Sequence, residues 1–383
     1  MTIVINALSA LRGGGQTYII NLLKHLPEGK YKIILIVNSK NKELFSTYIN
    51  EKVSISEAKS ASKSIIHRFL WEQFELPKFL KSSNVNVYYA PGGIMLTKIP
   101  ENIISATALR NMLPFDERER KRFPLVSYIR FKLWLLRFIF LSSYKKSDKI
   151  VFISEYSKSI VKEYIPDIDK KSIVIPHGLS KQFLEDKNTF DLPKELEENK
   201  FYLYVSILDV YKAQKEVIEA WKLLQKDGFE YPLVLVGPKY YEYGEEVIQL
   251  IKEKNLEKKV IYLGKVDYDK LPSLYKSSRA LIFASSCECC PNILLEKLSA
   301  SKPVICSNIE PMPEFGKDAV VYFNPYDPKM LAEQIIKLEK APEQMKELSQ
   351  KAYDLALTYN WNTTITKTIN YLINNKEKNN VQK

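Results

Sequence analysis

Two glutamates, Glu288 and Glu296, are the residues whose type and spacing best suit chemistry, with seven residues between them. An ionised carboxylate only accepts hydrogen bonds, whereas the hydroxyls of a sugar or a ribose donate them. Glutamate is also common on exposed helices, so a pair at this spacing arises by chance as well. The pair predicts a site for a hydroxyl-rich ligand only if the surrounding elements bring both carboxylates to one edge of the fold.

The residues around this pair predict a strand, a helix and a second strand. Residues 280–284 form a short apolar run, typical of a strand that helices cover on both faces. Residues 292–300 carry apolar side chains at helical spacing, and residues 303–306 are apolar again. Glu288 then follows the carboxyl end of a strand, and Glu296 lies on the next helix. Open parallel sheets bind their ligands at this edge.

In this stretch the sequence resembles glycosyltransferase family 4, whose signature is a glutamate, seven residues and a second glutamate in a strand, loop and helix. The flanking segments are also similar: YLGKVDYDKLPSLYKSSRALIFASS precedes the pair, and SKPVICSNIEPMPEFGKDAVVYFNPYDP follows it. The family's glycine-rich loop after the first glutamate is replaced here by Cys289, Cys290, Pro291 and Asn292. The resemblance covers nearly the whole chain and is strongest over residues 201–327.

The resemblance implies an α/β protein of GT-B architecture, with two doubly wound Rossmann-like domains facing each other across a cleft. It implies transfer of a sugar, with retained configuration, from a nucleotide-diphosphate donor to a glycan or lipid-linked acceptor in bacterial surface polysaccharide synthesis. No cofactor, metal or protein nucleophile is expected. Glu288 would orient the hydroxyls of the donor sugar, and Glu296 would orient the ribose.

Lysines and helix-start amides are expected to hold the donor diphosphate. Lys212 matches the lysine of a basic pair in the family, while Ile207 stands where the arginine is expected. Lys215 would compensate if it shared a helical face with Lys212. Three further residues are predicted to bind the donor: Asn292 and Ile293, whose amides begin a helix, and Val266.

The chain opens with a strand, a glycine turn and a helix, the first unit of a doubly wound fold. Residues 3–7 form the strand, Arg12 to Gln16 the turn, and residues 17–26 an amphipathic helix. Gly14 and Gly15 would let backbone amides approach a phosphate, although the spacing is not the G-x-G-x-x-G fingerprint.

Alternating strands and helices continue in two runs, which predicts two domains with boundaries at 1–180, 181–200 (linker), 201–358 and 359–383. The last segment is expected to return to the first domain and to end in a frayed polar tail from residue 374. Further strands are predicted at 31–37, 85–89, 103–107, 149–154, 172–178, 201–207, 232–237 and 260–264, and helices at 69–80, 216–225, 244–254, 331–339 and 359–372.

Arg110 and Asn111 follow a predicted strand, where the family often has a histidine near the donor sugar. They are candidates on the acceptor side. The alternative is that Arg110 caps or pairs locally.

Charge is distributed unevenly along the chain. The net charge is +12, and residues 1–180 hold 28 Lys and Arg against 15 Asp and Glu. A basic first half either faces an anionic partner, such as nucleic acid or an acidic membrane surface, or serves solubility alone. Residues 118–149 predict a basic amphipathic helix, which favours a cytoplasmic protein attached peripherally to the inner, anionic membrane surface. A core helix with snorkelling arginines is the alternative.

Several other classes fit less well. The aromatics form no basic-aromatic platform, so no nucleic-acid partner is expected, and a basic nucleic-acid-binding protein is kept only as an alternative. A nucleotide-sugar epimerase of the same fold is the other alternative.

The four cysteines, Cys287, Cys289, Cys290 and Cys306, lack the spread of a disulfide framework and are expected to be reduced. Two Asp-x-Asp triplets, at 167–169 and 267–269, are interpreted as structural, with Asp267 capping a helix. No apolar run reaches the length of a membrane span, and the N-terminus lacks a basic leader, so export is not expected.

Overall fold

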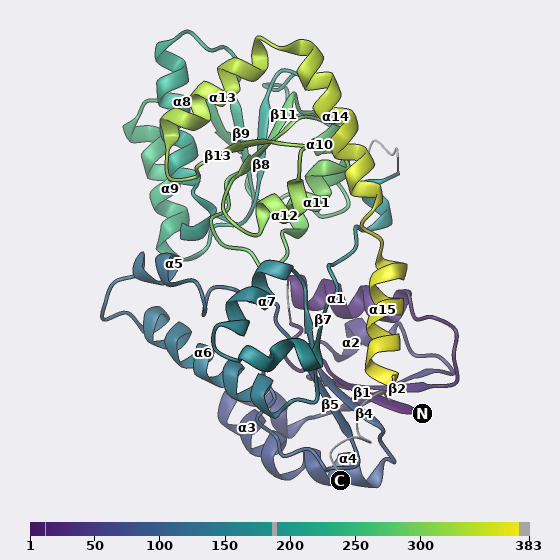
Figure 1. Ribbon diagram of the computed structural model, residues 1–383. Helices are drawn as coiled ribbons and strands as arrows, with labels where there is room; N and C mark the ends of the chain where they lie inside the picture. Colours follow the sequence, from purple (N-terminus) through teal and green to yellow (C-terminus); the bar gives the residue numbers. More distant parts are fainter. Residues whose placement is uncertain (12, 186–189, 375–383) are drawn as a thin grey trace. The chain divides into compact units, whose positions relative to one another are not determined.

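The computed structural model describes residues 1–11, 13–185 and 190–374. The chain divides into two compact units, drawn in Figure 1. Unit 1 comprises Met1–Phe115, Phe123–Gly178 and Trp361–Lys383, and unit 2 comprises Asp116–Arg122 and Leu179–Asn360. The chain therefore passes between units close to the predicted positions 180 and 359. Residues 116–122, predicted within the first domain, belong instead to unit 2. Arg12, part of the predicted linker (186–189) and most of the predicted tail (375–383) lie outside the described residues.

Unit 1 is built on a parallel sheet of seven strands in the order β3-β2-β1-β4-β5-β6-β7. In the register of the central strand, Ile3 lies opposite both Ile33 and Val87. The sequence interpretation missed β3, which alternates polar and apolar residues at the sheet edge. The strands are β1 (Thr2–Asn6), β2 (Lys32–Val37), β3 (Val53–Glu57), β4 (Val87–Ala90), β5 (Ile104–Ala108), β6 (Lys149–Phe152) and β7 (Ser172–Val174).

Helices cover both faces of this sheet. Ile3 and Ile5 of β1 point into a core shared with α1 (Gly13–Lys24) and with the C-terminal α15 (Trp361–Ile373). Val4 points into a second core on the opposite face, under α3 (Ile65–Phe74) and α4 (Leu76–Ser82). The C-terminal helix is thus part of unit 1. The remaining unit 1 elements are α2 (Lys42–Ser46), η1 (Ser60–Ser62), α6 (Tyr128–Lys146), α7 (Glu155–Lys162) and η2 (Pro166–Lys171).

Several predicted helices have other bounds in the structure. The basic helix predicted at 118–149 is two helices, α5 (Glu117–Lys121) and α6 (Tyr128–Lys146). The single helix predicted at 69–80 is two helices, α3 (Ile65–Phe74) and α4 (Leu76–Ser82). Pro77 cannot donate an amide to the preceding turn, so it stands near the start of a new helix. The Ser64 side chain caps α3 by accepting from the amide of His67. Helix α1 begins at Gly13 rather than residue 17, so the glycines form its first turn.

Unit 2 has a parallel sheet of six strands in the order β10-β9-β8-β11-β12-β13. β8 and β11 are neighbours, with Tyr202 opposite Ala280, so their carboxyl ends lie together. The strands are β8 (Tyr202–Val205), β9 (Leu233–Val236), β10 (Val260–Tyr262), β11 (Ala280–Phe283), β12 (Val304–Ser307) and β13 (Val321–Phe323).

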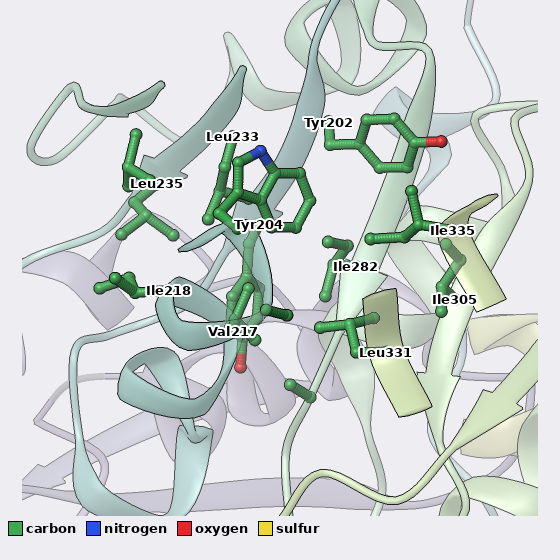
Figure 2. Packing of buried hydrophobic residues seen from close by; sticks show 14 of the residues in the cluster. Tyr202, Tyr204, Val217, Ile218, Leu233, Leu235, Ile282, Ile305, Leu331 and Ile335 are labelled. Carbon is green, nitrogen blue, oxygen red and sulfur yellow. The ribbon is translucent and has the colours of Figure 1, made fainter. Parts of the chain in front are cut away.

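The core of unit 2 consists of strand side chains and the helices packed on them. Figure 2 shows Tyr202, Tyr204 and Ile282 from the sheet against Val217 of α8 (Gln214–Lys226) and Leu331 of α13 (Pro328–Glu339). These contacts anchor α8 and α13 to the sheet. The other unit 2 elements are α5 (Glu117–Lys121), η3 (Lys181–Phe183), η4 (Val210–Lys212), α9 (Tyr241–Glu253), α10 (Leu271–Ser277), α11 (Asn292–Leu298), α12 (Met312–Gly316) and α14 (Pro342–Leu357).

Candidate active site

The carboxyl ends of β8 and β11 place Lys212 and Glu288 beside each other. Lys212 ends η4, in the loop after β8, and Glu288 lies in the loop after β11. The Lys212 ammonium forms an ion pair with Oε1 of Glu288, and their side chains are only 5% and 17% exposed. The Ser285 hydroxyl donates to the same carboxylate oxygen at 2.8 Å. The two predicted catalytic residues therefore form one charged cluster.

Burial makes this cluster electrostatically strong. The Lys212 ammonium lies 4.6 Å from the centre of the Tyr211 ring, and the Tyr204 hydroxyl donates to the Lys212 carbonyl. A charge so removed from water acts on its neighbours with less screening than a surface charge. The position can therefore stabilise negative charge on a phosphate, or orient a carboxylate that grips hydroxyls.

Glu296 lies on α11 and is held by two tyrosines. Its side chain is buried, with Oε1 accepting from the Tyr268 hydroxyl at 2.8 Å and Oε2 from the Tyr275 hydroxyl at 3.4 Å. Burial raises the pKa of Glu296 to about 7, and the Tyr268 hydrogen bond opposes that rise. The carboxylate is thus fixed in direction and sensitive to pH near neutrality.

Lys297, the next residue, is fully buried and was not predicted as part of the site. Its ammonium donates to the Val205 carbonyl at 3.2 Å and lies 5.0 Å from the centre of the Tyr275 ring. Burial lowers the pKa of Lys297 to about 7, and the nearby charge of Glu296 counteracts that fall. Lys297 and Glu296 therefore share Tyr275 as a neighbour and influence each other's charge.

The remaining donor-side predictions in unit 2 have mixed outcomes. The Asn292 amide donates to the Cys290 carbonyl at 2.9 Å, so it is engaged within its own loop rather than directed outwards. The role of the Ile293 amide stays a prediction. Val266 is half-buried in the segment between β10 and α10, and its role also stays a prediction.

The expected helical face shared by Lys212 and Lys215 is not formed. Ala213 adopts a left-handed conformation with φ of 53°, which separates η4 from α8. Lys215 instead pairs with Glu246 at 2.6 Å, on the neighbouring α9. The idea that Lys215 supplements Lys212 by helical spacing is therefore wrong, because backbone geometry between them interrupts the helix.

The predicted residues of unit 1 lie at the carboxyl edge of its own sheet. Gly14 and Gly15 belong to the first turn of α1, and their role toward a phosphate stays a prediction. The Asn111 side chain accepts from the Leu113 amide at 3.2 Å and so stabilises its own turn.

Arg110 is anchored by residues of unit 1. Its Nε donates to the Pro91 carbonyl at 3.1 Å, and Nη2 donates to the Tyr89 hydroxyl at 3.2 Å. Nη1 contacts Nε2 of His177, and the guanidinium lies 3.3 Å from the centre of the Tyr18 ring. These contacts match the local-pairing alternative. They leave the acceptor role of Arg110 as a prediction.

The Asp-x-Asp triplets contact nearby lysines. Asp169 pairs with Lys158 at 2.8 Å, and Asp267 pairs with Lys270 at 3.4 Å. The predicted cap by Asp267 is wrong, because α10 is preceded by Lys270 at its N-cap and no side chain caps it. Within the part of the chain that the structure describes, no group of three or more His, Cys, Asp or Glu side chains is arranged to hold a metal.

Sequence reasoning missed Ser285, Tyr268, Tyr275 and Lys297. Ser285 had a signal, since it directly follows a buried strand and precedes Glu288 by three residues. Lys297 had a weaker one, a lysine between leucines in an apolar helix. The two tyrosines had none, because their distance from Glu296 in sequence hides the contact.

Two family descriptions match the chain in sequence. "Glycosyltransferase Family 4" matches residues 12–183, and "Glycosyl transferases group 1" matches residues 186–355. Together they cover most of the chain and meet where unit 1 gives way to unit 2. The chain is a glycosyltransferase of the family 4 type. The predicted family and enzyme class are thereby confirmed.

This glycosyltransferase is similar to curated bacterial enzymes over part of its length. It is 28% identical over 172 residues to the O-antigen chain mannosyltransferase B of Escherichia coli, covering 44% of this chain and 45% of the relative. It is 29% identical to the N-acetylgalactosamine-N,N'-diacetylbacillosaminyl-diphospho-undecaprenol 4-alpha-N-acetylgalactosaminyltransferase of Campylobacter jejuni, covering 48% of each. The alignments thus span less than half the length of these relatives.

Its fold is similar to that of solved structures over almost the whole chain. The crystal structure of Anabaena Alr3699/HepE in complex with UDP superposes with a TM-score of 0.73 at 15% identity, covering 97% of this chain and 99% of that one. Such a likeness shows the fold. The prediction of a GT-B protein with two parallel-sheet α/β domains is confirmed.

Proposed function

We propose that this glycosyltransferase transfers a sugar, with retained configuration, from a nucleotide-diphosphate donor to a glycan or lipid-linked acceptor in surface polysaccharide synthesis. The observation that carries the proposal is the buried Lys212–Glu288 pair, with Glu296 on the helix that follows at the same sheet edge. Two relatives support the acceptor class: one is named as an O-antigen chain mannosyltransferase, and the other as a glycosyltransferase acting on a diphospho-undecaprenol compound. A structural neighbour solved with UDP supports the donor class.

Each residue of the site has a distinct role in this proposal. Lys212 stabilises the charge that develops on the departing diphosphate, which is the main electrostatic demand of the reaction. Glu288 orients the hydroxyls of the donor sugar, and Ser285 holds that carboxylate in place. Glu296 accepts from the ribose hydroxyls, with its direction set by Tyr268 and Tyr275. Unit 1 binds the acceptor.

A panel of nucleotide sugars in a thermal-shift assay tests the donor class. We expect one nucleotide diphosphate and its sugar to raise the melting temperature, and the corresponding free sugar to leave it unchanged. The anomeric configuration of the product, read by NMR, then tests retention. Conversion of the nucleotide sugar into an epimer without transfer, or salt-sensitive binding of random DNA without any nucleotide-sugar effect, would contradict the proposal.

We further propose that the protein works at the cytoplasmic face of an anionic membrane. In the described residues, no helix is long and apolar enough to span a bilayer. We propose that attachment rests on a surface of the folded chain. A lipid-linked acceptor would be presented at such a surface.

A further inference from the structure

Helix α6 of unit 1 has two apolar faces, of which only one is buried in the protein. Leu133, Phe140 and Tyr144 pack into unit 1, as a helix of a core would. At about 100° per residue, the opposite side of the helix carries a second apolar stripe. Its members are exposed, with Phe131 61% accessible to solvent. The exposed stripe consists of Tyr128, Phe131, Trp134, Leu135 and Phe138.

The rings of this stripe contact one another rather than the core. The Phe131 and Trp134 rings stack with centroids 6.0 Å apart, and the Trp134 and Phe138 rings meet edge to face at 4.6 Å. Leu125 and Val126, which precede the helix in sequence, are exposed as well. Contiguous exposed apolar surface of this kind marks an interaction site.

Helix α3 adds a second exposed apolar face in the same unit. Its Trp71 is buried, whereas Ile65 is 85% exposed, and Ile66, Phe69 and Phe74 are exposed as well. Both helices lie on one face of the sheet, because Met95 packs in the same core as Trp71 and donates its amide to the Ser143 hydroxyl of α6 at 2.9 Å. Figure 1 shows α3 and α6 at this side of unit 1. More than half of the large exposed apolar side chains among the described residues lie on these two helices and at residues 125–126.

Charge indicates what covers this surface. Helix α6 contains no acidic residue, and its basic residues flank the stripe. Arg130 and Lys132 lie on either side of Phe131, at about 100° around the helix, while Lys145 and Lys146 follow the stripe at its C-terminal end. Aromatic rings flanked by long basic side chains match the interfacial zone of an anionic bilayer, where rings enter the headgroup region and cations reach phosphates.

We infer that the exposed faces of α3 and α6 together form a surface that inserts into an anionic lipid bilayer. The inference deepens the proposed function, because a membrane-bound enzyme is suited to a lipid-linked acceptor. Rings from α6 and aliphatic side chains from α3 enter the interface, and the basic residues of α6 bind lipid phosphates. Two helices give the unit two separated points of attachment and thus a fixed orientation on the bilayer.

Vesicle flotation of the full chain tests this surface. The probes are vesicles of phosphatidylcholine alone and vesicles that also contain phosphatidylglycerol. We expect flotation with the anionic vesicles, and a loss of binding of about tenfold or more in Trp134→Ser/Phe138→Ser and separately in Ile66→Ser/Phe69→Ser. Leu357→Ser, an exposed apolar residue of α14 in unit 2, is the matched control and should float like the wild type.

Other outcomes would overturn the inference. A wild type that stays unbound in both vesicle types at low salt refutes it. If only the α6 variant loses binding, α3 has no lipid role. Sedimentation that shows a dimer abolished by the same variants would assign the surface to a second copy of the chain. Thermal shifts with the nucleotide sugar, measured on each variant, separate this test from the proposed transfer: they should not change, whether or not lipid binding is lost.

Discussion

The ammonium of Lys212 and the carboxylate of Glu288 neutralise each other at the carboxyl edge of the unit 2 sheet. Their side chains come from residues 76 positions apart, and both are largely removed from water. The pair leaves neither charge alone in a buried setting, where an unpaired charge is costly. A donor whose phosphates approach Lys212 and whose hydroxyls approach Glu288 would use both charges at once.

Replacing Lys212 should separate binding from stability. We expect Lys212→Met to weaken nucleotide-diphosphate binding by about tenfold to a hundredfold, since charge-assisted hydrogen bonds contribute about 1.5–3 kcal/mol. The melting temperature should also fall, because Glu288 loses its partner. In Lys212→Met/Glu288→Gln the melting temperature should recover while affinity stays low. Calorimetry with Lys215→Met as control checks this, and equal losses in both lysine variants would contradict it.

Nucleotide binding should weaken as pH falls through about 7, the pKa to which burial raises Glu296. Below that pH the carboxyl is protonated and accepts weaker hydrogen bonds from ribose hydroxyls. Glu296→Gln should bind about tenfold to a hundredfold more weakly at pH 8 and lose this pH dependence. Affinity titrations from pH 6 to 8.5 are the measurement. A wild-type affinity that does not vary over this range would refute the assignment.

The buried Lys297 should cost stability near neutral pH. Burial lowers its pKa to about 7, so between that pH and the ordinary pKa of lysine the unfolded chain binds more protons than the folded one. Stability from this residue therefore rises with pH over that interval. We expect Lys297→Met to unfold at equal or higher urea concentration at pH 7 and to lose that pH-dependent gain. The pH midpoint of the change in nucleotide affinity, which follows the titration of Glu296, should also move to higher pH, because a neighbouring positive charge is gone. If this midpoint does not move, Lys297 has no electrostatic effect on Glu296 and contributes to packing alone.

Sugar transfer should be insensitive to chelators. Lys212 supplies positive charge where a metal would otherwise be needed, and the two Asp-x-Asp triplets pair with lysines. We expect equal initial rates with and without EDTA, measured by release of the nucleotide. Activity lost in EDTA and restored by magnesium or manganese would return attention to those triplets.

Much of the fold was accessible from local patterns. Apolar runs identified the buried strands, and the alternation of strand and helix identified two doubly wound units. The edge strand β3 was missed because one side of an edge strand faces solvent and its pattern is mixed. The break between α3 and α4 was missed although Pro77 marks it. Periodicity is a property of neighbouring residues. A misleading pattern therefore changes the prediction for one helix or strand and leaves the rest of the fold unaffected.

The sequence by itself determined which residues could do chemistry, whereas the tertiary structure decided their partners. Type and spacing singled out Glu288 and Glu296, and the family resemblance added Lys212. Only the fold brought Lys212 to Glu288, gave Glu296 two tyrosine donors and turned Lys215 away toward Glu246. Exposure was decided in the same way: the apolar residues of α6 read alike in sequence, but packing on the sheet buries one face and leaves the other in solvent. Contacts between segments far apart in the chain depend on how the helices pack on the sheets, and no local sequence pattern determines that packing.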